Sequence, residues 1–325
     1  MAPDYVTVGS ITLDWVISAE GEMNLAGCGG AVLYAAAGAH LWNDSVAVVS
    51  RVGKGYRSEY LRDFSEHGVD VSAVRAIEEP HTQIALIEYE ADGDRHGFDP
   101  HKVFASRGIP LPDILRDAPV SEDEHTNCEE ESNLNPSPSD MGDNFWRAKG
   151  FHIAPLPHTV QEAFATRLND RGARFTLDPG LDCEKDELIR FLSTLPIVLP
   201  SKEEADRLLG EQDLNAGIDR LARLGPKVVV VKLGRLGSMV HDAQTGRRSL
   251  VPVLPTIAKD PTGAGDAYCG GFLVGYSETQ DPFESALRAT VSASFVVEDF
   301  DARYALRFTR KDAEARLERL RLLAA

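Results

Sequence analysis

The segment at residues 260–272 (DPTGAGDAYCGGF) combines residue types that could carry out a chemical step. Gly263 and Gly265 free the backbone for a tight turn, and the small apolar residues after Asp266 favour a helix that begins there. The first N–H groups of a helix lack intrahelical partners and mark its positive end, so the turn predicts a phosphate or oxyanion site. A carboxylate at its edge suits phosphoryl transfer to an alcohol, because a base must accept the hydroxyl proton. The alternative is that Asp266 only caps the helix.

The same segment resembles the C-terminal signature of the ribokinase family, also called the PfkB family of carbohydrate kinases. Similar blocks follow in order along nearly the whole chain. The resemblance implies a ribokinase-like α/β domain with a small β lid, ATP as the phosphoryl donor and Mg2+ as a cofactor. It implies that Asp266 is the catalytic base. The turn formed by Gly263, Ala264 and Gly265 would be the anion hole for the transferred phosphate.

The acceptor residues are assigned by the same resemblance. Asp14 matches an Asp that binds acceptor hydroxyls, and a carboxylate can accept from two adjacent hydroxyls, as a polyol offers; the alternative is a turn residue. Gly29 and Gly30 match a glycine pair that lets the acceptor approach the backbone. Tyr34 replaces the usual Asn and either stacks on a ring or belongs to the core. Arg95 matches a lid Arg that faces the acceptor, although Arg on hairpins is usually solvated.

Further residues are assigned to the nucleotide. Asp260 and Thr262 match positions beside the phosphates, and Gly234 and Gly237 match the turn under the nucleotide. Lys232 stands where the family often has Thr. It either pairs with an ATP phosphate as a point charge or is a surface lysine at a strand end.

The metal block is Ser201 to Glu204. Glu204 matches a Glu that helps to place Mg2+ through water, while Ser201 replaces the usual Asn. The alternative for Glu204 is a first-turn acid that complements the helix dipole. The segment at 298–302 differs from the family segment after the last core helix, so activation by a monovalent cation, potassium in particular, is left open.

Along the rest of the chain, short β-rich runs alternate with helical patterns. This alternation predicts an α/β fold with a mainly parallel central sheet flanked by helices, and with ligands at the carboxyl ends of the strands. Strands are expected at 5–9, 45–49, 151–154, 174–177, 197–199 and 228–232, and helices at 31–42, 58–67, 159–170, 203–209 and 214–224. One domain, 1–325, is expected, with lid segments at about 12–25 and 82–99.

Residues 117–144 interrupt this pattern with nine acidic residues and no Lys or Arg. The segment has few large apolar side chains to offset the entropy of ordering, so we interpret it as a mobile acidic surface insertion. An acidic docking segment is the alternative.

Composition limits the function classes. The 325 residues carry a formal charge of −17, which disfavours nucleic acid as a partner. Four cysteines without a CxxC pair suit a reducing compartment. There is no apolar run long enough for a membrane span and no signal-peptide pattern at the start, so a cytoplasmic protein is expected. Lids in the family often pair between subunits, so a homodimer is left open.

The function predicted from the sequence is ATP-dependent phosphorylation of an alcohol group of a sugar or sugar-like molecule, with Asp266 as general base. Two alternatives remain. One is a nucleoside kinase, in which Tyr34 could stack on a base. The other is a non-catalytic ligand-binding protein on the same fold, because fold does not fix function.

Overall fold

A large sheet and a small sheet organise the computed structural model, which describes residues 2–91, 93–116, 125–126, 132–179, 185–210 and 213–324. The large sheet has the order β14-β13-β12-β11-β10-β9-β1-β4-β5 and is parallel except at β13 and β14. Its strands are β1 (Tyr5–Val8), β4 (Val46–Lys54), β5 (Asp70–Pro80), β9 (Gly150–Ile153), β10 (Phe175–Leu177), β11 (Ile197–Val198), β12 (Val228–Lys232), β13 (Ser238–Asp242) and β14 (Arg248–Val251).

Helices cover both faces of this sheet, because alternate strand residues are apolar on both sides. On β4, Val46 and Val48 join one core and Ala47 and Val49 the other. The first face packs against α1 (Ala31–His40), α2 (Ser58–Glu66), α8 (Ala264–Thr279), α9 (Pro282–Val296) and α10 (Arg310–Ala324). The second packs against α4 (His158–Asp170), α5 (Lys185–Leu192), α6 (Lys202–Leu209) and α7 (Leu214–Leu224). The predicted α/β fold is confirmed.

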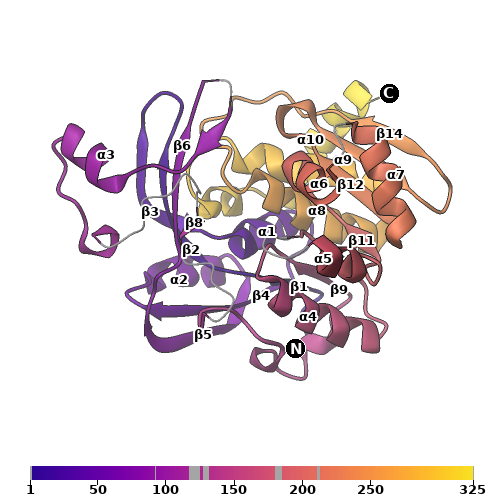
Figure 1. Ribbon diagram of the computed structural model, residues 1–325, viewed down its shortest axis with the longest axis horizontal. Coiled ribbons are helices and arrows are strands. Elements are labelled where there is room, and N and C mark those ends of the chain that lie inside the picture. The colour runs from indigo at the N-terminus through magenta and orange to yellow at the C-terminus, as the bar shows by residue number, and fades with distance from the viewer. Residues whose placement is uncertain are drawn as a thin grey trace.

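The small sheet, called the lid below, has the order β3-β2-β6-β7, with β8 also paired to β6. Its strands are β2 (Thr12–Ile17), β3 (Met23–Gly29), β6 (Ile84–Tyr89), β7 (Arg95–His96) and β8 (His125–Thr126). It projects from the body at the upper left of Figure 1, with α3 (Pro100–Ser106) beyond it. The outer face of the lid is covered by the chain itself, since Trp15 packs on Phe104 of α3.

Helices α1 and α8 cross at very close range. A β-carbon on Gly38 would lie 2.2 Å from the Ala267 carbonyl oxygen, and one on Gly270 would lie 1.9 Å from that of Ala35. Only glycine permits this approach, and it fixes how the first turns of the two helices lie relative to each other.

Part of the acidic segment differs from the expectation of a mobile insertion. Leu134 and Met141 are buried, and Asp140, also buried, forms an ion pair with Arg51 of β4 at 2.7 Å. A few apolar residues and one paired carboxylate therefore hold residues 132–144 against the body. Except for β8, the rest of the segment lies outside the described residues.

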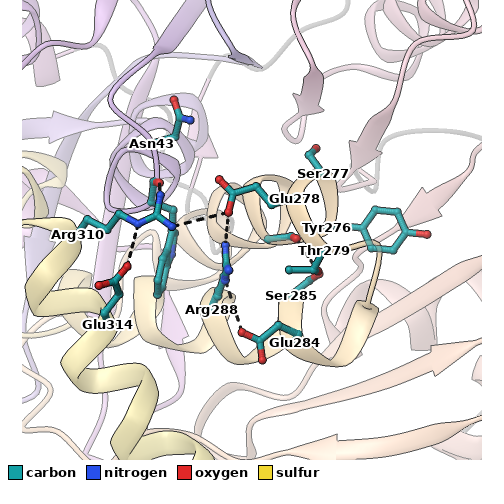
Figure 2. A network of polar contacts seen from close by, with 12 residues as sticks. Asn43, Tyr276, Ser277, Glu278, Thr279, Glu284, Ser285, Arg288, Arg310 and Glu314 are labelled. Atoms are coloured by element: carbon teal, nitrogen blue, oxygen red, sulfur yellow. Dashed lines mark hydrogen bonds and ion pairs between the residues drawn. The ribbon is translucent and has the colours of Figure 1, made fainter.

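The far ends of α8, α9 and α10 are joined by charged side chains. Glu278 of α8 contacts Arg288 of α9 at 2.6 Å and Arg310 of α10 at 3.9 Å (Figure 2). Short 3-10 turns complete the architecture: η1 (Asp113–Leu115), η2 (Pro138–Asp140), η3 (Phe145–Arg147), η4 (Gly234–Leu236) and η5 (Ala302–Arg307). Within the described ranges, no helix has the length and apolar character needed to cross a membrane.

Candidate active site

Three neighbouring strands of the large sheet end at the same edge and deliver charged side chains there. Asp178 follows β10, Glu204 lies in the first turn of α6 after β11, and Lys232 is the last residue of β12. Because carboxyl ends of parallel strands meet at one edge, these residues converge although they are far apart in sequence. Lys232 forms a buried ion pair with Asp178.

Lys232 points toward the glycine turn predicted as the anion hole. A β-carbon on Gly265 would lie 3.5 Å from Lys232 Nζ. Burial alone would lower the pKa of Lys232, but Asp178 and the neighbouring Glu204 and Asp266 outweigh it and keep that pKa well above its ordinary value. The lysine is therefore a permanent cation beside the turn. It is not the surface lysine that the sequence left open.

The glycine turn lies where the sequence placed it, at the N-terminus of α8. Gly263 has φ +73°, in the left-handed region that favours glycine, and α8 begins at Ala264. The first N–H groups of α8 and the positive end of its dipole face the same edge as Lys232. Backbone donors and a fixed cation together suit a transferring phosphoryl group.

Asp266 lies in the first turn of α8 and is partly exposed. Burial raises its pKa to about 6, while Lys232 and Arg95 oppose the shift. A carboxylate with a pKa near 6 is mostly ionised at neutral pH and is a better proton acceptor than an ordinary Asp. Arg95 is an exposed lid residue whose charge reaches this carboxylate.

Asp14 and the paired glycines form a second half of the site. The Asp14 carboxylate accepts a hydrogen bond from Thr12 and occupies the space beside Gly29, where a β-carbon would lie 1.9 Å from it. Gly30 has φ +102° and precedes α1. Asp14 is only 2% exposed, and burial raises its pKa to about 7.

Tyr34 connects the two halves. Its ring lies under the glycine turn, since a β-carbon on Gly263 would lie 2.0 Å from the ring, and its hydroxyl donates to Asp14 at 3.5 Å. The side chain is 2% exposed. Of the two sequence interpretations, this structure shows the core position.

Asp260 and Thr262 form the approach to the glycine turn, and both are buried. The Thr262 N–H donates to Asp260 Oδ1 at 2.9 Å, while Asp260 Oδ2 has no partner among the described residues. Burial raises the pKa of Asp260 to about 6. Tyr89 of the lid contacts the Thr262 hydroxyl at 3.0 Å.

The predicted nucleotide turn lies at the same edge. Gly234 and Gly237 close η4 with a backbone hydrogen bond of 3.0 Å directly after β12. Gly237 has φ +96°, and a β-carbon there would lie 2.1 Å from the Val251 carbonyl oxygen. The positive φ and the close carbonyl oxygen explain the glycine at 237, and Gly234 is exposed to solvent.

Ser201 and Glu204 make a capping box at the start of α6. Each side chain bonds the backbone N–H of the other residue, at 2.5 Å for the Glu204 carboxylate and 3.2 Å for the Ser201 hydroxyl. This arrangement accounts for the serine, which is a good N-cap residue. Glu204 remains close enough to affect the pKa of Asp266 and Lys232.

Four residues of the site were missed by the sequence analysis. Asp178, Thr12 and Tyr89 have been described, and the fourth is Asp301. Asp301 accepts a hydrogen bond from the Cys28 N–H at 2.8 Å and so holds the glycine block of the acceptor half. For Asp178, its place directly after a predicted strand was an available signal; the others lacked a local pattern.

Comparison with known proteins places this geometry in a family. The profile described as "pfkB family carbohydrate kinase" matches residues 141–308. The chain is 30% identical over 292 residues to a cytidine kinase of Thermococcus kodakarensis, covering 88% of this chain and 92% of that protein. The chain belongs to the PfkB family. As a PfkB protein it is a kinase that phosphorylates a sugar or a nucleoside with ATP.

Solved structures confirm the fold. A nucleoside kinase of Methanocaldococcus jannaschii, an archaeal member of the ribokinase family, aligns with a TM-score of 0.70 at 21% identity, over 98% of this chain and 99% of that one. A putative ribokinase II of E. coli in complex with ATP and Mg2+ aligns with a TM-score of 0.71 at 18% identity over the same shares. The ribokinase-like fold predicted from the sequence is thus confirmed.

Proposed function

We propose that this PfkB kinase transfers the γ-phosphoryl group of ATP to a hydroxyl of a nucleoside. The observation that carries the proposal is the inner face of the lid. Asp14 pairs in register with Ala85, and the next inward positions are Val16 and Ile87, so one carboxylate borders an apolar patch. A nucleoside combines a ribose diol with a base of apolar faces. A free sugar would place hydroxyl groups against the patch without partners.

Phe300 governs access to this patch, because it packs on Val16, Ala85 and Ile87 in the structure. Binding a base there requires Phe300 or the lid to move aside. The 30% identity to a cytidine kinase supports the same acceptor class.

In the proposed mechanism, Asp14 accepts hydrogen bonds from the ribose diol and Asp266 accepts the proton of the attacking hydroxyl. The N-terminus of α8 and Lys232 stabilise negative charge on the transferring phosphoryl group. The nucleotide lies along η4, between Gly234 and Gly237.

Magnesium would arrive with the nucleotide. Within the described ranges there is no cluster of three or more side chains suited to a metal ion. Mg2+ usually keeps several of its waters and takes phosphate oxygens as ligands, so it needs only one or two carboxylates from the protein. Glu204 and Asp178, which has one buried oxygen without a partner in the described part of the chain, would hold its waters. When bound, the ion neutralises phosphate charge.

A monovalent cation is proposed beside Asp260. The second carboxylate oxygen of Asp260 is buried without a partner among the described residues, and Asp301 and Asp299 add negative charge nearby. Potassium chloride should therefore raise turnover relative to choline chloride at equal ionic strength. Equal rates in the two salts would remove this cation from the proposal.

We also propose a location for the enzyme in the cell and consider its oligomeric state. ATP and nucleosides are cytoplasmic metabolites, which supports a cytoplasmic enzyme. A homodimer stays a prediction that light scattering on the purified chain can test.

The deciding experiment measures phosphorylated product from Mg-ATP with a panel of nucleosides and of free sugars. We expect at least one nucleoside to exceed every sugar in kcat/KM. Asp266→Asn should lower kcat by about 100-fold or more, the size of a general-base contribution, with ATP binding retained.

Each part of the proposal can fail separately. A sugar preferred over every nucleoside would overturn the acceptor class. Near-normal turnover by Asp266→Asn would remove Asp266 as the base. ATP binding without any product would favour the ligand-binding alternative.

A further inference from the structure

Both hairpins of the lid reach the same short segment of the body, residues 259–262. From the β2–β3 turn, Glu22 forms an ion pair with Lys259 at 3.0 Å. From the end of β6, Tyr89 Oη lies 3.0 Å from Thr262 Oγ1. A movement of the lid would therefore break contacts to the segment that leads into the glycine turn.

The two contacts differ in strength. Glu22 and Lys259 have side chains 60% and 36% exposed, and Lys259 also contacts Asp299 at 3.1 Å. An exposed and shared ion pair contributes little and is screened by salt. Tyr89 and Thr262 are each only 6% exposed, and a buried hydroxyl that loses its partner carries a clear penalty. The buried hydrogen bond is thus the contact that can couple the lid to the turn.

Thr262 is well placed to transmit that contact. Its N–H is bonded to Asp260 Oδ1 at 2.9 Å, and the next residue, Gly263, begins the turn into α8. Its side chain is bonded to the lid. Burial raises the pKa of Tyr89 to about 12, so its hydroxyl remains protonated at any working pH and can donate to Thr262.

We propose that Tyr89 is a positioning residue that couples closure of the lid over the acceptor to the geometry of the phosphate turn. With the lid closed, the hydrogen bond between the Tyr89 and Thr262 hydroxyls holds Thr262 and the turn in place for transfer. With the lid open, the bond is broken and the turn loses this support. The inference rests on the proposed transfer to an acceptor held under the lid.

The consequence is a choice between two phosphoryl acceptors. In productive transfer the acceptor oxygen forms the new P–O bond, the bond to the ADP oxygen breaks, and the hydroxyl proton goes to Asp266. If the lid is not held closed by this bond, water reaches the phosphoryl group and forms the P–O bond instead, its proton goes to Asp266, and inorganic phosphate and ADP are released. Loss of the Tyr89 hydroxyl should therefore favour hydrolysis relative to transfer.

The test uses Tyr89→Phe in the full chain, with Mg-ATP and the best nucleoside of the panel. We expect kcat to fall by about tenfold, the effect of one buried hydrogen bond, with the KM for ATP unchanged. We also expect the ratio of inorganic phosphate to phosphorylated nucleoside to rise several-fold. This ratio does not depend on the fraction of folded enzyme, so it remains informative if the variant is less stable.

Tyr268→Phe is the matched control. Tyr268 is also buried, and its hydroxyl contacts the hydroxyl of Ser238 at 2.8 Å without involving the lid. It should lose similar thermal stability while its phosphate-to-product ratio stays at the wild-type value.

The outcomes separate the hypotheses. A Tyr89→Phe variant with the wild-type ratio overturns the coupling, whether kcat is normal or lowered. An equal rise of the ratio in both variants also overturns it, because the effect would then not come from the lid. If the wild-type chain phosphorylates no acceptor, the proposed function itself fails.

Discussion

Buried or partly buried carboxylates dominate the candidate site at the scale of single residues. Burial raises the pKa of Asp14 to about 7, and that of Asp260 and Asp266 to about 6. Each acid also raises the pKa of Asp14, because like charges disfavour ionisation. Keeping these carboxylates ionised at neutral pH therefore costs folding stability.

This cost predicts a gain of stability for Asp14→Asn. Folded Asp14 titrates near 7 and an unfolded Asp near 4, so the folded protein loses stability as the pH rises between these values. A difference of three pKa units corresponds to a loss of at most about 4 kcal/mol in the free energy of unfolding. We expect Asp14→Asn to raise the thermal midpoint at pH 8, with no gain below pH 4.

The same variant should lose acceptor affinity, because the amide is a weaker acceptor for a diol. Thermal unfolding of both proteins across the pH range, together with the acceptor KM, provides the measurement. A midpoint that is lowered at pH 8 would contradict the pKa of Asp14.

The sequence could predict site residues that lie close together along the chain, but not those that meet only in the folded structure. Asp266 and Gly263 were identified because turn, helix start and carboxylate lie within a few residues of each other. Tyr89 and Asp301 act on partners 173 and 273 positions away, and no local pattern marks such contacts. For Tyr34, the sequence showed the residue type but could not show that Gly263 lies against its ring.

The contact of α1 with α8 is the decisive feature at the scale of elements. Each helix begins at one half of the site, α1 after Gly30 and α8 after Gly263. The crossing at Gly38 and Gly270 fixes their separation. Helix ranges such as 214–224 were predicted correctly from their apolar spacing, whereas the glycine contact requires knowing which helices are neighbours.

Gly38→Ala tests this contact with a clear sign. Alanine normally stabilises a helix interior by about 1 kcal/mol relative to glycine. Here the new β-carbon would lie 2.2 Å from the Ala267 carbonyl oxygen, and overpacking of this kind costs about 1–3 kcal/mol. We expect a net loss of stability in urea unfolding, together with a lower kcat because both turns shift. Increased stability would show that the helices separate easily.

At the scale of the whole molecule, a charged network and the proposed catalytic turn lie at opposite ends of α8. The helix has 16 residues and is about 24 Å long. Its first turn forms the proposed phosphate site, and Glu278 near its other end contacts Arg288 (Figure 2). Arg288 also lies over the Trp42 ring. The charged network therefore joins α8, α9, α10 and Trp42, which follows α1, away from the proposed site.

Arg288→Met should consequently affect stability alone. The arginine side chain is 14% exposed, and its loss removes the 2.6 Å partner of Glu278, whereas Glu284 keeps Arg321 at 2.5 Å. We expect a cost of about 1–3 kcal/mol. Arg62→Met is the control, because Arg62 has an exposed ion pair with Glu66 and should change stability by less than about 0.5 kcal/mol. Urea unfolding measures both, and a large fall in the kcat of Arg288→Met would contradict the separation.

The tight crossing of α1 and α8 has a consequence for how such a kinase can diversify. The two glycine turns belong to one rigid unit, whereas the apolar patch of Val16, Ala85 and Ile87 belongs to the lid. In the proposed mechanism, contacts to the acceptor base and transfer of phosphate thus lie on separate parts of the structure. Substitutions on the inner face of the lid can change the preferred acceptor while the transfer machinery stays intact, so the lid is the natural target for redesigning specificity.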